Sequence, residues 1–300
     1  MKLYYSPEYV CAAYSFDTTR KAQWIADSLA TRSIKGVEIV APAPLTRSDL
    51  LHAHSGEYVN AVRTGSPSWL AESQGFQWDA AMWPMVLASN GGVLAAARSA
   101  LTDGAAGSLS SGLHHARYDE GAGYCTFNGL VITAKTLLAA GEVFSVLILD
   151  LDAHCGGGTA QLVDGDSRIW HTDVAVSDFD TYPVFNRSNY VDDAQHYLPV
   201  IQQALKEAET AGPFDICLYN AGMDPHEGCV TGGIRGITSE VLARREQLVF
   251  HWCRQRNLPV AFVLAGGYVS SKLSQETLVD LHRLTITEAA GAGGGGWLSH

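Results

Sequence analysis

The stretch "LILDLDAHCGGG", residues 147–158, joins a short apolar run to a sudden cluster of polar side chains. Residues 147–149 have the pattern of a buried strand. Side chains alternate along a strand, so Asp150, Asp152 and His154 lie on one side if the strand stays extended to its end. Three such groups at the carboxyl end of a strand indicate either a salt-bridge network or a metal site.

Apolar runs typical of strands alternate with helical patterns along the rest of the chain. The predicted strands are Lys2–Ser6, Val37–Ala41, Ser145–Asp150, Arg168–His171, Asp215–Asn220 and Pro259–Leu264. The predicted helices are Thr19–Thr31, Asp79–Leu101, Asp192–Ala211, Thr238–Arg256 and Ser274–Ala290. This alternation predicts an α/β fold, with an open, mainly parallel sheet covered by helices on both faces. Ligands of such sheets bind beyond the carboxyl ends of the strands.

Composition narrows the classes of function. The 300 residues suit one domain over residues 1–290, followed by a glycine-rich tail at 291–300. The net charge of −11 argues against nucleic acid as a partner and suits a cationic substrate. We expect no signal peptide and no membrane span. The six scattered cysteines indicate free thiols in a reducing cytoplasm. Nothing in the sequence sets an oligomeric state.

Two further strand ends and one glycine-rich segment carry polar groups. Asp224 lies in "AGMDPHEG" after the strand at 215–220, and Tyr268 lies in "AGGY" after the strand at 259–264. The segment "SSGLHHARYDEGAGYCTFNG", residues 110–129, contains an adjacent pair of histidines. Each motif alone is as consistent with a turn or a packed loop. Together they cluster where this fold class places its sites.

The residue types indicate metal-assisted hydrolysis. Two carboxylates and one imidazole suit Zn²⁺ or Fe²⁺ with coordination positions left open, and Asp152, His154 and Asp224 form such a set. An ion there would acidify bound water and polarise a carbonyl. Adjacent histidines can act as base and acid, and a tyrosine hydroxyl can donate to a developing oxyanion. The inventory predicts an amide or ester hydrolase.

These motifs resemble those of the histone deacetylase superfamily, which includes acetylpolyamine amidohydrolases. "SGLHHARYDEGAGYCTFN" resembles the family's PGHHA…GFCxFN block, and "LDLDAHCGGGT" resembles DxDxHHGxGT. "NAGMDPHEG" resembles AGFDAHxxDP, "LAGGY" resembles EGGY, and "AHSGEYV" at residues 53–59 resembles VHxxxYL. The blocks follow the family's order and span most of the chain.

The resemblance implies an arginase–deacetylase type of sheet and a zinc-dependent amidohydrolase. Such an enzyme removes an acyl group, most simply acetyl, from a primary amine such as acetyl-lysine, an acetylpolyamine or a small acylated metabolite. The implied zinc ligands are Asp152, His154 and Asp224. Family members often hold a K⁺ beside the zinc through backbone carbonyls around Asp150, Asp152 and His154, and Asp173 is a candidate contributor.

The resemblance also implies catalytic roles. Metal-activated water attacks the amide carbonyl, with His115 as the base and acid. His114, paired with Asp150, tunes the charge beside it, and Tyr268 polarises the carbonyl. The tunnel for the acyl-amine chain is implied at Gly123 and Tyr124, with Phe179 and Tyr182 as candidates for its opposite wall.

Departures from the family pattern qualify these implications. Cys155 replaces a second histidine, and we expect it to be a buried small residue because neighbouring strand positions point to opposite faces. Gly157 stands where the family often has Asp or Asn, the partner of the second histidine of the pair. His115 therefore lacks that carboxylate, takes another partner or is held by a backbone carbonyl. "FDTTRKA", residues 16–22, replaces the HPE…R motif, and no rim aspartate is evident, which weakens the case for histone tails.

Two alternatives remain. A ureohydrolase such as arginase binds two Mn²⁺ and needs more carboxylates. The DxHxD run lacks its second Asp, because Gly156 stands there, and the second DxD is missing, because His226 stands two residues after Asp224. One metal is favoured, with His226 expected to be a solvent-exposed loop residue rather than an extra ligand. An inactive module that binds acyl ligands would be expected to lose the metal set or Tyr268, and both are present.

Overall fold

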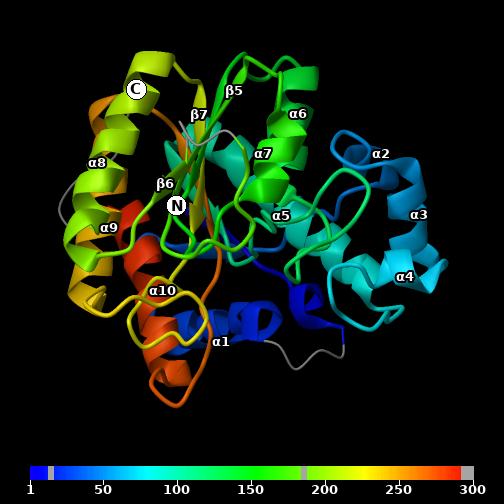
Figure 1. Ribbon diagram of the computed structural model, residues 1–300, viewed down its shortest axis with the longest axis horizontal. Coiled ribbons are helices and arrows are strands. Elements are labelled where there is room, and N and C mark those ends of the chain that lie inside the picture. The colour runs from blue at the N-terminus through cyan, green and yellow to red at the C-terminus, as the bar shows by residue number, and fades with distance from the viewer. Residues whose placement is uncertain (13–16, 184–187, 292–300) are drawn as a thin grey trace.

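A computed structural model describes residues 1–12, 17–183 and 188–291 of the chain (Figure 1). Its strands form one eight-stranded, wholly parallel sheet in the order β2-β1-β3-β8-β7-β4-β5-β6. The strands are β1 (Lys2–Tyr4), β2 (Glu38–Val40), β3 (Ala105–Ser108), β4 (Val146–Asp150), β5 (Ile169–Ala175), β6 (Ser188–Tyr190), β7 (Ile216–Ala221) and β8 (Val260–Leu264). The predicted fold class is confirmed.

The helices connect the parallel strands and vary widely in length. They are α1 (Asp17–Thr31), α2 (Arg47–Leu50), α3 (Gly56–Thr64), α4 (Ser68–Ala71), α5 (Met82–Asp103), α6 (Gly129–Ala139), α7 (Gly157–Val163), α8 (Ala194–Ala211), α9 (Ser239–Gln255) and α10 (Gln275–Ala289), with a 3₁₀ turn at Pro7–Val10. None of the described helices is long and apolar enough to cross a membrane.

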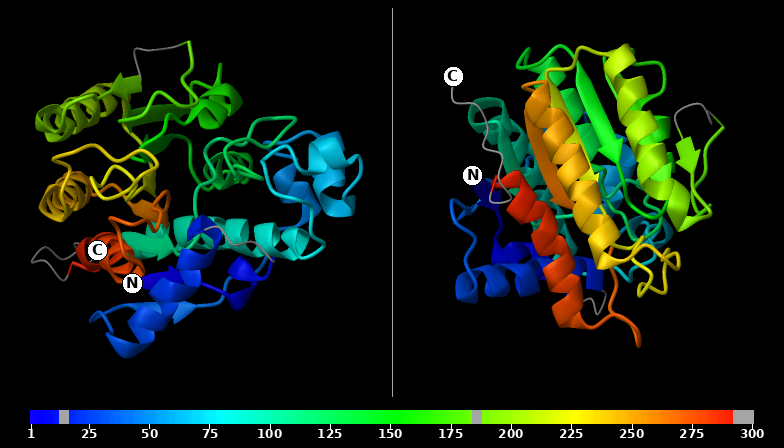
Figure 2. Two further views of the ribbon diagram at one scale, coloured as in Figure 1. Left: turned by 60° about the horizontal axis from the view of Figure 1, so that its bottom comes forward. Right: turned by 90° about the vertical axis from the view of Figure 1, so that its left-hand side faces the viewer.

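Two hydrophobic cores lie on opposite faces of the sheet. Along β4, Leu147 and Leu149 pack with α1, α8, α9 and α10, while Val146 and Ile148 pack with α3, α5 and α6. Figure 2 shows α8, α9 and α10 side by side on one face. All five residues of β4 are buried. A central parallel strand is covered on both faces, which explains why the 147–149 run is apolar without alternation.

Several elements were not predicted from the sequence. The missed strand β3 has the sequence AAGS, whose small side chains give no strand pattern. At Gly107 the reason is the neighbouring strand β8, because a Cβ there would come within 2.2 Å of the Phe262 ring. The short β6 and the helices α2, α3, α4, α6 and α7 were also missed. Strand β5 runs to Ala175, beyond the predicted end at His171. The prediction stopped early because polar Thr172 and Asp173 interrupt the apolar run. The predicted tail lies, from residue 292 onward, outside the described residues.

Register brings the strand ends that carry the motifs to one edge of the sheet. Asp150 at the end of β4 pairs with Asp173 of β5 on one side and with Asn220 of β7 on the other. β8 lies on the far side of β7 and ends at Leu264. The polar segments after β4, β7 and β8 therefore start at neighbouring points of the sheet.

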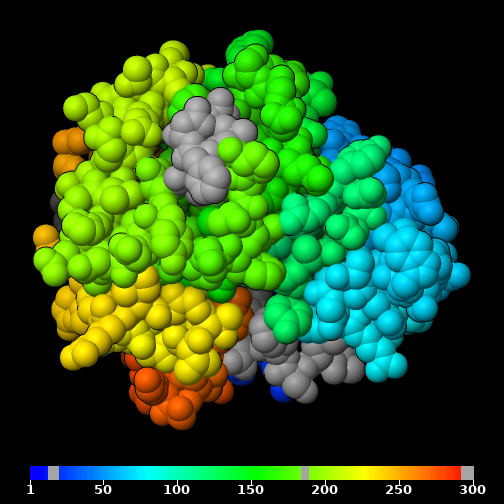
Figure 3. Space-filling view, viewed as in Figure 1, coloured from blue at the N-terminus to red at the C-terminus, as the bar shows by residue number. Residues whose placement is uncertain are grey.

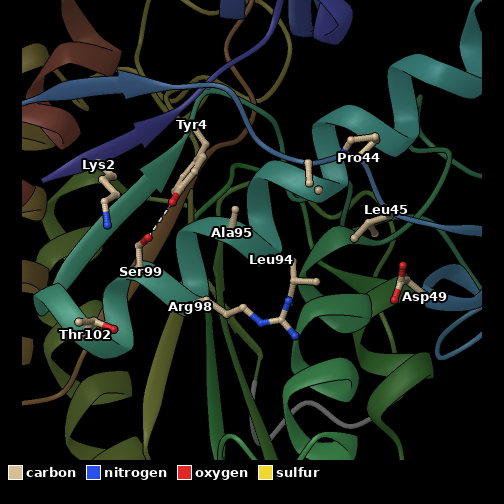
Figure 4. Close-up of a pocket in the computed structure, with 12 residues that line it drawn as sticks. Lys2, Tyr4, Pro44, Leu45, Asp49, Leu94, Ala95, Arg98, Ser99 and Thr102 are labelled. Atoms are coloured by element: carbon tan, nitrogen blue, oxygen red, sulfur yellow. Dashed lines mark hydrogen bonds between the residues drawn. The ribbon is translucent and has the colours of Figure 1, made fainter.

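A cavity of about 440 Å³ opens elsewhere, between β1, α5 and the segment after β2 (Figure 4). Its polar lining is engaged in the protein's own contacts: Arg98 bonds to Glu142, and the Tyr4 hydroxyl bonds to Ser99. None of the residues that the motifs single out lines it. The cavity therefore does not compete with the strand ends as the place of the chemistry.

Arg245 of α9 is a fully buried cation beneath those strand ends. Its Nη1 donates to the carbonyl oxygens of Leu151 at 3.2 Å and Gly222 at 2.7 Å, and it pairs with buried Glu246. A guanidinium with five donors suits such a site, because it can satisfy a carboxylate and two carbonyls at once.

We predict that Arg245→Met lowers the free energy of unfolding by roughly 3–5 kcal/mol, because it leaves Glu246 buried without its cation. Urea denaturation followed by circular dichroism measures the change. Arg244→Met, at an exposed position of the same helix, is the matched control and should change stability by less than about 0.5 kcal/mol. Equal effects of the two substitutions would contradict the prediction.

Candidate active site

Asp152, His154 and Asp224 converge as the sequence predicted, although by a different route. Strand β4 ends at Asp150, as predicted, so the alternation of an extended strand does not reach Asp152 and His154. Instead the chain turns, and the His154 amide donates to Asp152 Oδ1 at 3.0 Å. His154 Nδ1 then lies 3.1 Å from Asp152 Oδ1 and 3.2 Å from Asp224 Oδ2. One ligand atom from each of the three buried residues lies within 4.8 Å of the others.

The three side chains fit a divalent cation. Asp224 Oδ1 accepts from the Ala153 amide at 3.0 Å, whereas the buried Oδ2 accepts from no backbone amide and faces the His154 ring at 3.2 Å. Burial and the nearby Asp152 charge raise the pKa of Asp224 to about 6. Two buried carboxylates this close repel each other unless a cation lies between them. Two oxygens and one imidazole nitrogen form an established zinc donor set.

Two glycines make room for this arrangement. A Cβ on Gly266 would come within 2.0 Å of Asp224 Oδ2 and 2.5 Å of Asp152 Oδ2. A Cβ on Gly222 would come within 2.6 Å of the Asp152 Cα and 2.7 Å of Asp224 Oδ1. The Gly266 amide also donates to Asp152 Oδ2 at 2.6 Å. Backbone therefore packs directly against the carboxylates, which fixes their directions.

The adjacent histidines have opposite electrostatic environments. His114 Nδ1 lies 2.7 Å from Asp150 Oδ2, and Asp150 Oδ1 accepts from Asn220 at 2.8 Å. Burial disfavours a charged ring, but the Asp150 and Asp152 carboxylates outweigh it and raise the pKa of His114 to about 10. Burial and the neighbouring His114 lower the pKa of His115 to about 4. The two rings are therefore pushed in opposite directions: the carboxylates favour a proton on His114, whereas burial and His114 disfavour one on His115.

Asp180 is a site residue that the sequence did not reveal. It lies in the segment after β5, and its Oδ2 is 2.8 Å from His115 Nδ1, while its Oδ1 accepts from Arg117. Of the three possibilities left open for His115, the second therefore holds: it takes another carboxylate. The contact spans 65 residues of chain and follows no spacing rule, so the only sequence signal was the absence of a carboxylate at Gly157.

Two of the predicted tunnel residues lie against His115. The ring of Phe179, which is 50% exposed, meets His115 edge-on with centroids 5.0 Å apart, and lies 5.8 Å from His154. A Cβ on Gly123 would come within 2.4 Å of the His115 ring and 3.1 Å of Phe179. Figure 3 shows the segments before α6, after β5 and after β7 next to one another on one face.

The other two tunnel candidates lie against different neighbours. Tyr124 is 46% exposed, and its ring centroid is 5.2 Å from that of Phe76. Tyr182 lies against His171, with ring centroids 5.8 Å apart. The tunnel lining itself stays a prediction.

Tyr268 follows β8 by four residues and lies two residues after Gly266, which contacts both carboxylates. It is half-buried and packs against the core that includes α9 and α10. The carbonyl of Ala265, in the same turn, accepts from the buried ammonium of Lys21. Lys21 belongs to the "FDTTRKA" stretch, which the sequence had marked only as a departure.

The remaining candidates have mixed outcomes. Cys155 is fully buried, as predicted. His226 is not exposed as expected: it is buried and bonds to Ser239 Oγ at 3.2 Å, outside the metal-ligand group. Asp173 Oδ2 accepts from the Gly156 amide at 2.6 Å, and its Oδ1 has no hydrogen-bond partner. Burial, followed by the Asp150 charge, raises the Asp173 pKa. The potassium ion stays a prediction.

Comparison with known proteins places these motifs in one family. The sequence profile described as "Histone deacetylase domain" matches residues 15–283. An uncharacterized protein of Picosynechococcus is 30% identical over 250 residues, covering 79% of this chain and 81% of that protein. Histone deacetylase 2 of Arabidopsis thaliana is 26% identical over 257 residues, covering 78% of this chain and 64% of that protein.

Two solved structures share the fold. The HD domain of HDA15 matches with a TM-score of 0.78 and 19% identity, covering 97% of this chain and 91% of that one. An acetylpolyamine aminohydrolase from Burkholderia pseudomallei matches with a TM-score of 0.76 and 18% identity, covering 97% of this chain and 99% of that one.

We predict that Gly266→Ala weakens zinc affinity by at least about tenfold, because the added methyl group displaces both carboxylates. Competition with a chromophoric chelator measures the affinity directly. Gly56→Ala, whose Cβ would make only ordinary contacts at 3.7 Å, is the control and should bind zinc as the native chain does. Unchanged affinity in Gly266→Ala would show that the carboxylates are not the ligands.

Proposed function

The chain belongs to the histone deacetylase domain family, and we propose that it is a zinc-dependent hydrolase of linear amides that removes an acetyl group from a primary amine. The observation that carries this proposal is the buried Asp152–His154–Asp224 group, beside which two adjacent histidines are each paired with a carboxylate. Among the described residues, no second group of this kind accompanies it, which disfavours the ureohydrolase alternative.

Zn²⁺ held by Asp152, His154 and Asp224 would supply the Lewis acidity that polarises an amide carbonyl and makes water more acidic; Fe²⁺ suits the same donors. The protein's own groups then handle the protons. His115 is neutral, and Asp180 engages its Nδ1, so its Nε2 is the nitrogen that accepts a proton from the attacking water.

The neighbouring histidine has a different role. His114 is paired through Nδ1 with Asp150, and this pair tunes the charge beside the reacting carbonyl. The developing oxyanion also needs a hydrogen-bond donor, and we assign this role to the hydroxyl of Tyr268. Tyr268 lies two residues after Gly266, whose amide donates to the Asp152 carboxylate. When the carbon–nitrogen bond breaks, the proton held by His115 passes to the leaving amine.

The proposed substrate class is a small cationic acylated amine, such as an acetylpolyamine, with acetyl-lysine as the alternative. The net charge of −11 favours a cationic ligand over an anionic one through long-range attraction. The exposed aromatic ring of Phe179 beside His115 offers an apolar surface for a methylene chain. Release of free amine from a panel of acetylated polyamines and acetyl-lysine peptides, by the zinc-loaded chain, tests the proposal. No release from any member of the panel would contradict it.

We predict that Tyr268→Phe lowers kcat by about two to three orders of magnitude while zinc binding stays intact, because only the oxyanion donor is lost. Steady-state hydrolysis of the best panel substrate, with metal content measured on the same sample, provides the test. Tyr190→Phe, at an exposed position on β6, is the control. Near-native turnover in Tyr268→Phe would remove tyrosine from the mechanism.

A further inference from the structure

We propose that Asp180 is a positioning residue that holds His115 in the tautomer with the proton on Nδ1. Asp180 thereby replaces the side chain that the family often has at the position of Gly157. The catalytic role of His115 rests on the proposed function. The hydrogen bond between Asp180 and His115 is observed in the structure and does not depend on it.

Asp180 is held by several independent contacts. Its side chain is 4% exposed, with Oδ2 on His115 Nδ1 at 2.8 Å and Oδ1 accepting from Arg117 Nη2. The segment that carries it is tied to the turn after β4: the amides of Val176 and Ser177 both donate to the Ala153 carbonyl at 2.8 Å. The Cys155 amide donates to the Phe179 carbonyl at 3.1 Å. The carboxylate is therefore fixed relative to the metal-ligand turn.

Gly157 makes this arrangement possible. A Cβ at position 157 would come within 2.4 Å of the Asp180 carbonyl oxygen and within 2.5 Å of its Oδ1. The first of these atoms is backbone and has no rotamer with which to avoid the collision. A side chain at 157 and the observed position of Asp180 therefore exclude each other. The glycine therefore marks the replacement of one hydrogen-bond acceptor for His115 by another, rather than its loss.

Arg117 determines which oxygen of the Asp180 carboxylate faces His115. Because Arg117 only donates, it needs an oxygen at Oδ1, and the other carboxylate oxygen then faces His115. A carboxylate oxygen accepts, so Nδ1 carries the proton and Nε2 keeps a lone pair for the substrate water. An asparagine at 180 would give its oxygen to Arg117 and turn its NH₂ towards His115. That would move the ring proton to Nε2, where it blocks proton acceptance.

The test uses Asp180→Asn in the full chain, with two readouts. Long-range ¹H–¹⁵N NMR on histidine-labelled protein assigns the His115 tautomer without any substrate. We expect Nδ1–H in the native chain and Nε2–H in Asp180→Asn. Hydrolysis of the best acetylated amine should show kcat lowered at least about tenfold with KM within about twofold, because only orientation and tautomer change.

Further variants separate this role from a general structural one. Adding Arg117→Met to Asp180→Asn frees the amide to rotate and should restore Nδ1–H and part of kcat. Gly157→Ala should lower kcat by displacing Asp180. Asp178→Asn makes the same chemical change two residues away, at an exposed position, and should match the native chain.

A native tautomer in Asp180→Asn would overturn the proposal, and so would a switched tautomer with native kcat. If the native chain hydrolyses no acylated amine, the proposed function fails, whereas the NMR result still decides whether Asp180 sets the His115 tautomer.

Discussion

Two buried carboxylates facing one imidazole set the constraint on which the rest of this structure depends. Asp152 and Asp224 lie at the ends of neighbouring strands, and burying their charges is unfavourable unless cations and donors compensate. The fold supplies part of that compensation from beneath. Arg245 donates to the carbonyls of Leu151 and Gly222, each beside a ligand segment, and Lys21 donates to that of Ala265. The remaining negative charge faces the open end of the sheet, where a divalent ion would complete the balance.

The same constraint explains the glycines. Because backbone amides at Ala153 and Gly266 donate directly to the carboxylates, no side chain fits between them. Rigid orientation of the ligands follows, which suits a metal site that must keep coordination positions open for substrate. The glycine-rich motifs of this sequence are thus consequences of packing around charge.

How much the sequence could predict depended on whether a contact follows from strand geometry. The fold class and the convergence of Asp152, His154 and Asp224 were predictable, because parallel strands end at one edge and the motifs follow three of those ends. The β3 strand was not, since its four small residues have no strand pattern, and the contact that explains Gly107 is with Phe262 on another strand. Asp180 was not either, because its contact with His115 crosses between two loops. His226 was misjudged because Ser239, which buries and bonds it, belongs to another element.

The most direct test of this account is the number of metal ions bound per chain. Elemental analysis of the native protein, reconstituted with zinc and dialysed, should find one ion per chain, and Asp152→Ala should retain none while keeping its helical circular dichroism. Two ions per native chain would contradict a mononuclear centre and revive the ureohydrolase alternative. No bound ion would mean that the buried carboxylates serve structure alone, and the proposed chemistry would fail with it.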